Sequence, residues 1–418
     1  MPHLDRLAWR GAAAVLGVAA AVGIGAAAAL DADDPWIDWA GWSWPGEDPS
    51  VGFRWNHSYG PLDWPRDGTA LLRVESEEPH YWRVIQLDRF DGSGWEVATE
   101  QPSIERPLEL PGDVEGRAAQ GPPEPDWVQE VSFTIGGLES GLLLAPGAVL
   151  AVDGLDGVSP GAGGTSLTSE RLRDGDTYTV TSYAPKPSAE RLRASPASYP
   201  RALRRYTQLE LPRSLPLPEA ESGLTLSRPP TLTVPLYGQP RESRIAERLD
   251  ESLYAGVHSL ALRLSAGAES PYDAVAAIES HLRSGYSYTE TPPRRPVPLR
   301  DFLFRDRAGY CQQFSGAMAL MLRSLGIPSR VASGFSSGEA EQGGGAFQVS
   351  DRDAHSWVEA YFVGIGWVPF EPTPPAAPAG AQLSELAASR QVEATGTVIP
   401  RRGLVVPTVA GQLTAPEA

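Results

Sequence analysis

Cysteine, lysine and asparagine are almost absent from this 418-residue chain, which contains one of each: Cys311, Lys186 and Asn56. A single cysteine excludes a disulfide bond within the chain, so cysteine usage gives no information about the redox compartment. The six histidines are scattered without the spacing of a metal site, and we therefore expect no metal and no other cofactor. The formal charge of −17 argues against nucleic acid and anionic membrane surfaces as partners.

Long hydrophobic runs are also scarce, and the one that stands out is an uncharged, alanine-rich stretch over residues 11–30. As a helix it would span ~30 Å, the thickness of the hydrocarbon core of a membrane. Arg6 and Arg10 precede it and Asp31 follows it, so the positive-inside rule places the rest of the chain outside the cytoplasm. We expect a single-pass anchor in the cell membrane. A signal peptide cleaved near residues 27–29 and a buried alanine-rich helix are the alternatives.

Cys311 begins a predicted helix whose apolar side chains recur on one face with a 3.6-residue period: Phe314, Met318, Met321, Leu322 and Leu325. Gly326 suits the position after the last turn, and Pro328 forbids continuation of the helix. A strand is then predicted over Ser329–Phe335. A thiol at a helix N-terminus faces unpaired backbone N–H groups and the positive end of the helix dipole, and both favour the reactive thiolate.

Two further strands are predicted downstream, over His355–Tyr361 and Trp367–Glu371. If the five residues 362–366 form the hairpin loop, Glu371 lies diagonal to His355 on the same face and within side-chain reach. A slip of one residue in the pairing would move Glu371 to the other face.

A thiolate, an imidazole that takes and returns its proton, and an acid that orients the imidazole form a nucleophilic triad of the Cys-His type. Cys311, His355 and Glu371 supply these three groups. A buried, inert cysteine in a core helix is the structural alternative for Cys311 alone. The combination with a histidine and an acid favours the triad.

These residues lie in four ordered blocks: G-Y-C-x-x-F, L-R-S-L-G-I-P-S-R-V-A-S-G-F, D-A-H-S-W-V-E-A-Y and G-W-V-P-F-E-P-T-P. The blocks resemble the transglutaminase-like superfamily, a papain-type cysteine fold, and most of all its bacterial membrane-anchored branch. The resemblance implies that Cys311 is the nucleophile, His355 the base and acid, and Glu371 the third member. Many relatives have aspartate where Glu371 stands, and Asp353 is the second candidate for that role. The resemblance also implies a peptide or protein substrate and partners in the cell envelope.

The predicted fold class is α+β, with a cysteine-bearing helix packed on an antiparallel sheet that carries the histidine and the acid. Strands such as Tyr81–Leu87 and Tyr178–Tyr183, separated by Asp-Gly turns, predict a sandwich-like β domain ahead of this core. Helices are predicted over Arg244–Leu264 and after Ser270, an N-cap followed by proline.

The expected domain organisation has five parts. They are a membrane anchor (1–34), a β-rich extracytoplasmic domain (35–190), a connector (191–241), a catalytic domain (242–375) and a Pro/Ala-rich flexible tail (376–418).

The predicted function is that of an extracytoplasmic cysteine enzyme acting at amide bonds of peptides or proteins. Water as acceptor would make it a protease, and an amine would make it a transglutaminase; the sequence leaves the acceptor open. The alternative is a catalytically silent binding or scaffold protein of the cell envelope that keeps the fold. Residues Gly334–Gly338 also match G-x-S-x-G, but no helix-forming segment follows, which argues against a serine hydrolase.

Overall fold

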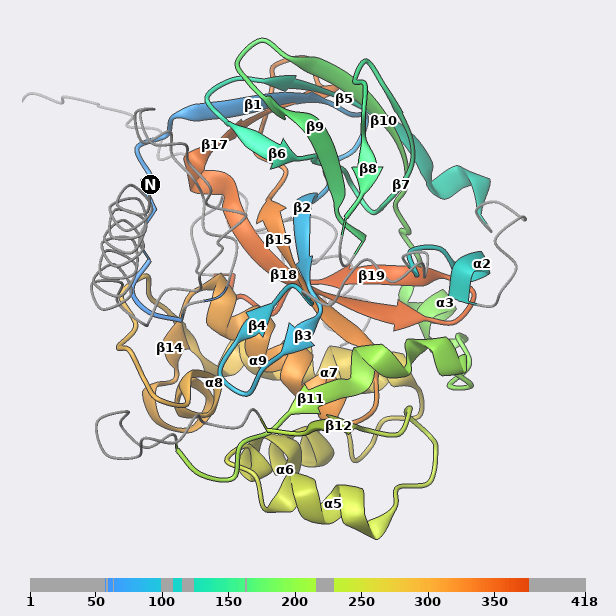
Figure 1. Cartoon of the computed structure of the whole chain (residues 1–418), viewed down its shortest axis with the longest axis vertical. Coiled ribbons are helices and arrows are strands. Elements are labelled where there is room, and N and C mark those ends of the chain that lie inside the picture. The colour runs from blue at the N-terminus through green and yellow to red at the C-terminus, as the bar shows by residue number, and fades with distance from the viewer. Residues whose placement is uncertain are drawn as a thin grey trace, which may run out of the picture. The chain divides into compact units, whose positions relative to one another are not determined.

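The computed structural model describes residues 57, 59–62, 64–98, 108–114, 124–161, 164–215 and 229–375, all within one compact unit, Trp55–Ala418. They form a mixed α/β fold with antiparallel sheets (Figure 1). The predicted membrane helix at 11–30 and the predicted tail at 376–418 lie outside the described residues. Within the described residues, no helix is both long enough and apolar enough to cross a membrane.

A four-stranded antiparallel sheet with the order β19-β18-β15-β2 lies at the centre of Figure 1. Its strands are β19 (Gly366–Phe370), β18 (Ala354–Phe362), β15 (Ser329–Phe335) and β2 (Trp82–Leu87). All four strands were predicted from the sequence to within one or two residues at each end. Three come from the C-terminal part of the chain, whereas β2 comes from far upstream.

The helix α9 (Cys311–Ser324) packs against β18 and β15, and α6 (Ala255–Leu264) and α7 (Pro271–Gly285) pack against α9 in turn. Thirteen of the fourteen residues of α9, all except Cys311, are buried, which agrees with its role as the core helix. The helix α7 (Pro271–Gly285) begins with the predicted cap: the Ser270 hydroxyl accepts from the backbone N–H of Asp273, and the Asp273 carboxylate accepts from the Ser270 backbone.

The single helix predicted over Arg244–Leu264 is wrong, because the chain forms two helices there: α5 (Ser243–Asp250) and α6 (Ala255–Leu264). Contacts with distant residues hold the break between them. The Leu253 N–H donates to the carbonyl of Pro212 at 2.9 Å, and the Tyr254 hydroxyl donates to the carbonyl of Gly92 at 2.8 Å. Local helical periodicity cannot anticipate such long-range hydrogen bonds.

Two further antiparallel sheets form the upper part of Figure 1. The six-stranded sheet has the order β16 (Glu339–Ala340), β17 (Ala346–Ser350), β1 (Ala70–Glu75), β5 (Val128–Ile135), β10 (Thr177–Tyr183) and β7 (Ala148–Asp153). The three-stranded sheet has the order β6 (Ser140–Leu142), β9 (Ser166–Leu172) and β8 (Ser159–Pro160).

The remaining elements are short. Three two-stranded pairs are present: β3 (Arg89–Phe90) with β4 (Trp95–Glu96), β11 (Gln208–Glu210) with β12 (Thr231–Thr233), and β13 (Ser287–Tyr288) with β14 (Ala308–Gly309), of which only the last is parallel. The short helices are α2 (Pro111–Val114), α3 (Ala189–Arg193), α8 (Pro298–Asp301), the 3₁₀ turns η2 (Pro125–Trp127), η4 (Arg201–Thr207) and η6 (Asp351–Asp353), and the π-helical turn η5 (Phe302–Asp306).

Strands are exchanged between the N-terminal and C-terminal parts of the chain. The upstream strand β2 pairs with β15, and the downstream strand β17 pairs with β1. The predicted boundaries at 190 and 242 therefore separate segments of sequence but do not separate sheets. The predicted division into domains stays a prediction.

Four charged side chains connect the two parts: Arg83, Arg330 and Glu359 are buried and Glu109 is partly buried. The Arg330 guanidinium contacts Glu359 at 2.7 Å and Glu109 at 2.6 Å, and Arg83 contacts the same two carboxylates at 3.1 and 3.3 Å. Two positive and two negative charges balance, and the side chain of Arg330 is fully buried. Burial alone would lower the pKa of Arg330, but Glu109 and Glu359 raise it above its ordinary value.

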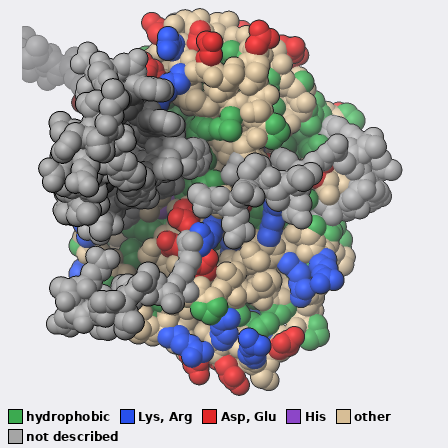
Figure 2. Space-filling model, in the orientation of Figure 1, with side chains coloured by type: hydrophobic (Ala, Val, Ile, Leu, Met, Phe, Trp, Pro, Cys, Tyr) green, Lys and Arg blue, Asp and Glu red, His purple; other side chains and the backbone are tan. Residues whose placement is uncertain are grey.

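The face shown in Figure 2 carries acidic and basic side chains in separate small groups among hydrophobic ones. On this face, the large negative net charge of the chain is not gathered into one field.

Replacing Arg330 by methionine should lower the free energy of unfolding by ~3–5 kcal/mol, because the buried Glu359 and the partly buried Glu109 would each lose a partner. Equilibrium unfolding of the full chain in urea measures the change. Arg73→Met is the matched control, since the Arg73–Glu341 pair is at 2.8 Å but lies at the surface. Equal losses in the two variants would contradict a structural role for the buried network.

Candidate functional site

The three side chains predicted to act together come from three adjoining elements. Cys311 is the first residue of α9, His355 is the second residue of β18, and Glu371 directly follows β19. The ladder between β18 and β19 pairs Phe362 with Gly366 and Val358 with Phe370. This is the predicted register, and it brings Glu371 to the face of the sheet that carries His355.

His355 and Glu371 form a buried, hydrogen-bonded ion pair. The Nε2 atom of His355 lies 2.5 Å from Oε2 of Glu371, and the two residues are 1% and 2% exposed. Burial alone would lower the pKa of His355, but the Glu371 carboxylate and the Cys311 side chain raise it to about 10. Burial would raise the pKa of Glu371, but His355 and neighbouring donors hold it below its ordinary value. The pair is therefore an imidazolium and a carboxylate at neutral pH.

Cys311 is half-buried and interacts electrostatically with the ring of His355. The other ring nitrogen of His355, Nδ1, makes no hydrogen bond of standard geometry with any described residue. Because Nε2 is occupied by Glu371, Nδ1 is the ring atom that remains to exchange a proton with the thiol. This arrangement can carry out nucleophilic chemistry at sulfur.

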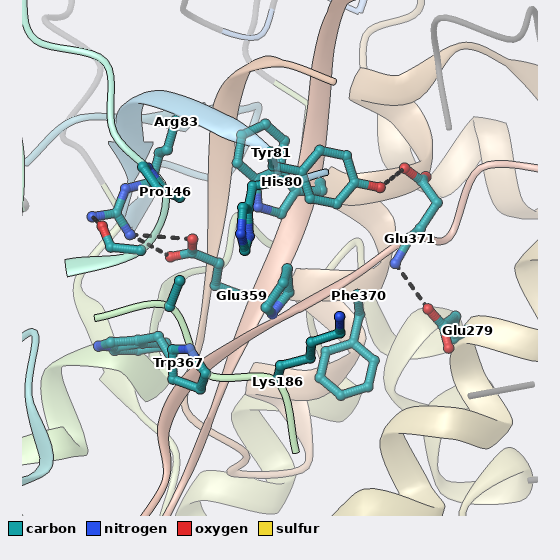
Figure 3. A pocket seen from close by; sticks show the side chains of 15 residues that line it. His80, Tyr81, Arg83, Pro146, Lys186, Glu279, Glu359, Trp367, Phe370 and Glu371 are labelled. Carbon is teal, nitrogen blue, oxygen red and sulfur yellow. Dashed lines mark hydrogen bonds and ion pairs between the residues drawn. The ribbon is translucent and has the colours of Figure 1, made fainter. Parts of the chain in front are cut away.

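Several groups fix Glu371 in place. Its Oε2 accepts a hydrogen bond from the Tyr81 hydroxyl at 2.7 Å, and its Oε1 accepts from the Thr373 N–H at 2.8 Å. Its backbone N–H donates to Glu279 at 2.8 Å, and its backbone carbonyl accepts from Arg283 at 2.7 Å. Figure 3 shows Tyr81 and Glu279 on opposite sides of this residue. Both the backbone and the side chain of Glu371 are therefore held.

Asp353, the second candidate for the acid, has a different role. Its carboxylate accepts from the backbone N–H and the hydroxyl of Ser350 at 2.7 and 2.8 Å, and so caps the 3₁₀ turn η6. Glu371, rather than Asp353, is the acid hydrogen-bonded to His355. The chain after Gly334–Gly338 continues into β16 and not into a helix, so the G-x-S-x-G segment lacks the geometry of a nucleophile elbow.

Sequence reasoning missed a polar cluster beside Cys311. Arg66 forms an ion pair with Glu290, approaches the Tyr288 hydroxyl at 3.4 Å and donates to the carbonyl of Arg352 at 2.6 Å. Both Arg66 and Tyr288 interact electrostatically with Cys311. Burial and the neighbouring Cys311 raise the pKa of Tyr288 above its ordinary value. No spacing rule links residue 66 to residues near 290, so only the fold reveals this cluster.

A cavity lies behind the acid, between the four-stranded sheet and the segment around Lys186 (Figure 3). Tyr81, Trp357 and Phe370 form apolar walls, and Glu371 also faces it. Cys311 is not among its lining residues. Within the described part of the chain, no three acidic, histidine or cysteine side chains are grouped as metal ligands.

Comparison with known proteins identifies the family. The model of the transglutaminase-like superfamily matches residues 258–372, and the model of the TgpA N-terminal domain matches residues 4–189. Residues 258–372 of the chain belong to the transglutaminase-like superfamily. The superfamily match contains Cys311, His355 and Glu371, whereas Tyr81 and Arg66 lie in the N-terminal match.

Two curated relatives are similar to this superfamily member. A protein-glutamine gamma-glutamyltransferase of Pseudomonas aeruginosa is 28% identical over 321 residues, which cover 75% of this chain and 39% of that protein. The uncharacterized protein YebA of Bacillus subtilis is 40% identical over 136 residues, 30% of this chain and 18% of that protein. The chain therefore covers less than half the length of either relative.

A solved structure, the periplasmic domain of TgpA from Pseudomonas aeruginosa, is 24% identical with a TM-score of 0.46. The match covers 73% of this chain and 88% of that one.

The pKa shifts of the ion pair predict how its stabilising effect depends on pH. Because the pKa of His355 is raised, its contribution is complete below about 6.5, the ordinary histidine value, and is lost as the pH rises toward about 10. Because the pKa of Glu371 is lowered, its contribution is present above the ordinary glutamate value and is lost as the pH falls through the folded-state pKa.

The difference in unfolding free energy between the wild type and a His355→Gln/Glu371→Gln double variant should therefore be largest near pH 5–6.5 and decrease on both sides. Urea unfolding at a series of pH values measures it. His281→Gln is the control, because burial and then Arg307 lower the pKa of His281, so no loss above pH 6.5 is expected there. A flat difference for the double variant would contradict the charged pair.

Proposed function

We propose that this chain is a cysteine enzyme that transfers acyl groups at amide bonds of peptides or proteins, with Cys311 as the nucleophile. His355 is the general base and acid, and Glu371 orients its ring. The observation that carries the proposal is the buried hydrogen bond from Nε2 of His355 to Glu371, which leaves Nδ1 for the sulfur. Membership of the transglutaminase-like superfamily adds support.

In the first half of the reaction, the Cys311 thiolate attacks the carbonyl carbon of the amide, and the electron pair of the C=O bond moves to the oxygen. The backbone N–H of Cys311 lies in the first turn of α9, where N–H groups have no partner within the helix, so it can donate to that oxygen. The oxygen then re-forms its double bond and the C–N bond breaks. The imidazolium of His355 gives its proton to the departing amine.

The product of this step is a thioester on Cys311, and His355 is then neutral. In the second half, His355 removes a proton from water or from an amine as that acceptor attacks the thioester carbon. The C–S bond breaks and the thiolate and imidazolium pair is restored. Water gives hydrolysis, and an amine gives a new amide bond. The similarity to a protein-glutamine gamma-glutamyltransferase supports a glutamine side chain as acyl donor and an amine as acceptor.

We place the catalytic unit outside the cytoplasm. The uncharged run at residues 11–30 is long enough for a single membrane anchor, and the arginines before it and Asp31 after it favour an extracytoplasmic position for the rest of the chain. Proteins of the cell envelope are then the accessible substrates and partners.

Alkylation by iodoacetamide tests the thiol directly, because Cys311 is the only cysteine. At pH 7, Cys311 should react at least about tenfold faster in the wild type than in His355→Ala, since the imidazolium stabilises the thiolate. Mass spectrometry of the full chain gives the rate. His281→Ala is the matched control and should react like the wild type. Equally slow labelling of wild type and His355→Ala would favour the catalytically silent binding or scaffold protein.

A glutamine-containing peptide and a fluorescent primary amine test the acceptor. We expect release of ammonia and incorporation of the amine into the peptide by the wild type, and neither by Cys311→Ser. Mass spectrometry distinguishes the amine adduct from glutamate and from a cleaved backbone. Cleavage of the backbone without an adduct would show that the enzyme is a protease rather than a transglutaminase.

A further inference from the structure

A tyrosine from the N-terminal part of the chain completes the site. Resting on the proposed function, we infer that Tyr81 is a positioning residue that acts through Glu371: its hydroxyl holds the carboxylate in line with His355. In this role Tyr81 takes no part in proton transfer. Its effect reaches Cys311 through the acid and the imidazole.

The first observation is a shared acceptor. Oε2 of Glu371 accepts both the hydrogen bond from Nε2 of His355 at 2.5 Å and the hydrogen bond from the Tyr81 hydroxyl at 2.7 Å. The other oxygen, Oε1, is held by the Thr373 N–H at 2.8 Å. A phenol that donates to a carboxylate favours the ionised form and removes its freedom to turn about the last side-chain bond. Without Tyr81, Thr373 and His355 would be the remaining donors to this carboxylate.

The second observation is that the hydroxyl is itself fixed by ring packing. The ring of Tyr81 stacks on Trp357 with centroids 4.4 Å apart and an interplanar angle of 12°, and it stacks on His355 at 5.7 Å and 22°. Tyr81 is 7% exposed. The same ring therefore restrains the imidazole through its face and the carboxylate through its hydroxyl, as Figure 3 shows for the second contact.

The third observation is the route by which Tyr81 reaches the site. It directly precedes β2, whose first residue, Trp82, pairs with Phe335 of β15. Phe335 in turn pairs with Ala354, the neighbour of His355 on β18. The sheet register therefore places Tyr81 at the end of the sheet that carries His355. The superfamily match at 258–372 contains the three proposed catalytic residues but not this donor.

Tyr81→Phe removes the hydroxyl and keeps the stacked ring. With iodoacetamide as the probe and the full chain as the sample, we expect Cys311 alkylation at pH 7 to slow by about tenfold, the effect of losing one hydrogen bond to a charged group. The pH at which alkylation becomes fast should also rise, because a misaligned carboxylate stabilises the imidazolium less. Tyr178→Phe is the matched control, since its buried hydroxyl bonds to Leu144 at 3.2 Å within the upper sheets. It should leave both the rate and the pH profile unchanged.

A double-mutant cycle with Glu371→Gln distinguishes positioning from general support of the fold. If Tyr81 acts through Glu371, adding Tyr81→Phe to Glu371→Gln should change the alkylation rate by less than about twofold. A full additional tenfold loss in the double variant would overturn the inference. So would a Tyr81→Phe variant whose rate and pH profile match those of Tyr178→Phe.

Failure of the inference and failure of the proposed function give different results. If wild type and His355→Ala react equally slowly, the proposed function fails. The alkylation rates in the double-mutant cycle then carry no information about Tyr81. If the wild-type rate depends on His355 but not on Tyr81, only the inference fails. Near-UV circular dichroism and thermal unfolding of each variant confirm that the compared proteins share the native packing.

Discussion

The buried contact between His355 and Glu371 is the interaction around which the site is built. Two charges removed from water are costly unless they meet each other and their remaining hydrogen-bonding positions are filled. Here the geometry is close, at 2.5 Å, and Tyr81 and Thr373 fill the other positions of the carboxylate. The close geometry that offsets this desolvation cost requires a fixed backbone. Arg283 and Glu279 supply it by binding the carbonyl and the N–H of Glu371.

The four-stranded sheet brings residues that are far apart in the sequence to this contact. β2 adds to β15 as an edge strand and brings Tyr81 to the acid and Arg83 to the buried charged network. Arg83 and Arg330 bind the same two carboxylates, Glu109 and Glu359, so a shift of β2 would disturb four charges together. The structural network and the site thus depend on one strand register. A protein with strands exchanged in this way is expected to lose its site when either part is displaced.

The sequence predicted α9 and the strands of the four-stranded sheet because the signals for these elements are local. Apolar periodicity predicted α9 and alternation predicted β18, and the assumption of a five-residue loop at 362–366 led to the register that brings Glu371 to His355. Prediction from the sequence failed where an element or a site depends on a contact between residues far apart in the chain. The break between α5 and α6 depends on residues 92 and 212, and Tyr81 and Arg66 meet the site from more than 200 positions away. Asp353 was a candidate by proximity in sequence, but its local use as a cap for η6 removes it.

Glutamate rather than aspartate at position 371 follows from this geometry. The residue lies one step beyond the end of β19, and its backbone is fixed by Glu279 and Arg283, so it cannot move closer to His355. An aspartate on the same backbone would be shorter by one carbon–carbon bond, roughly 1.5 Å. Its oxygen would then lie outside hydrogen-bond distance of Nε2, which is 2.5 Å away in the native pair. The longer side chain also brings Oε2 within reach of Tyr81, so the length of Glu371 and the position of Tyr81 form one arrangement.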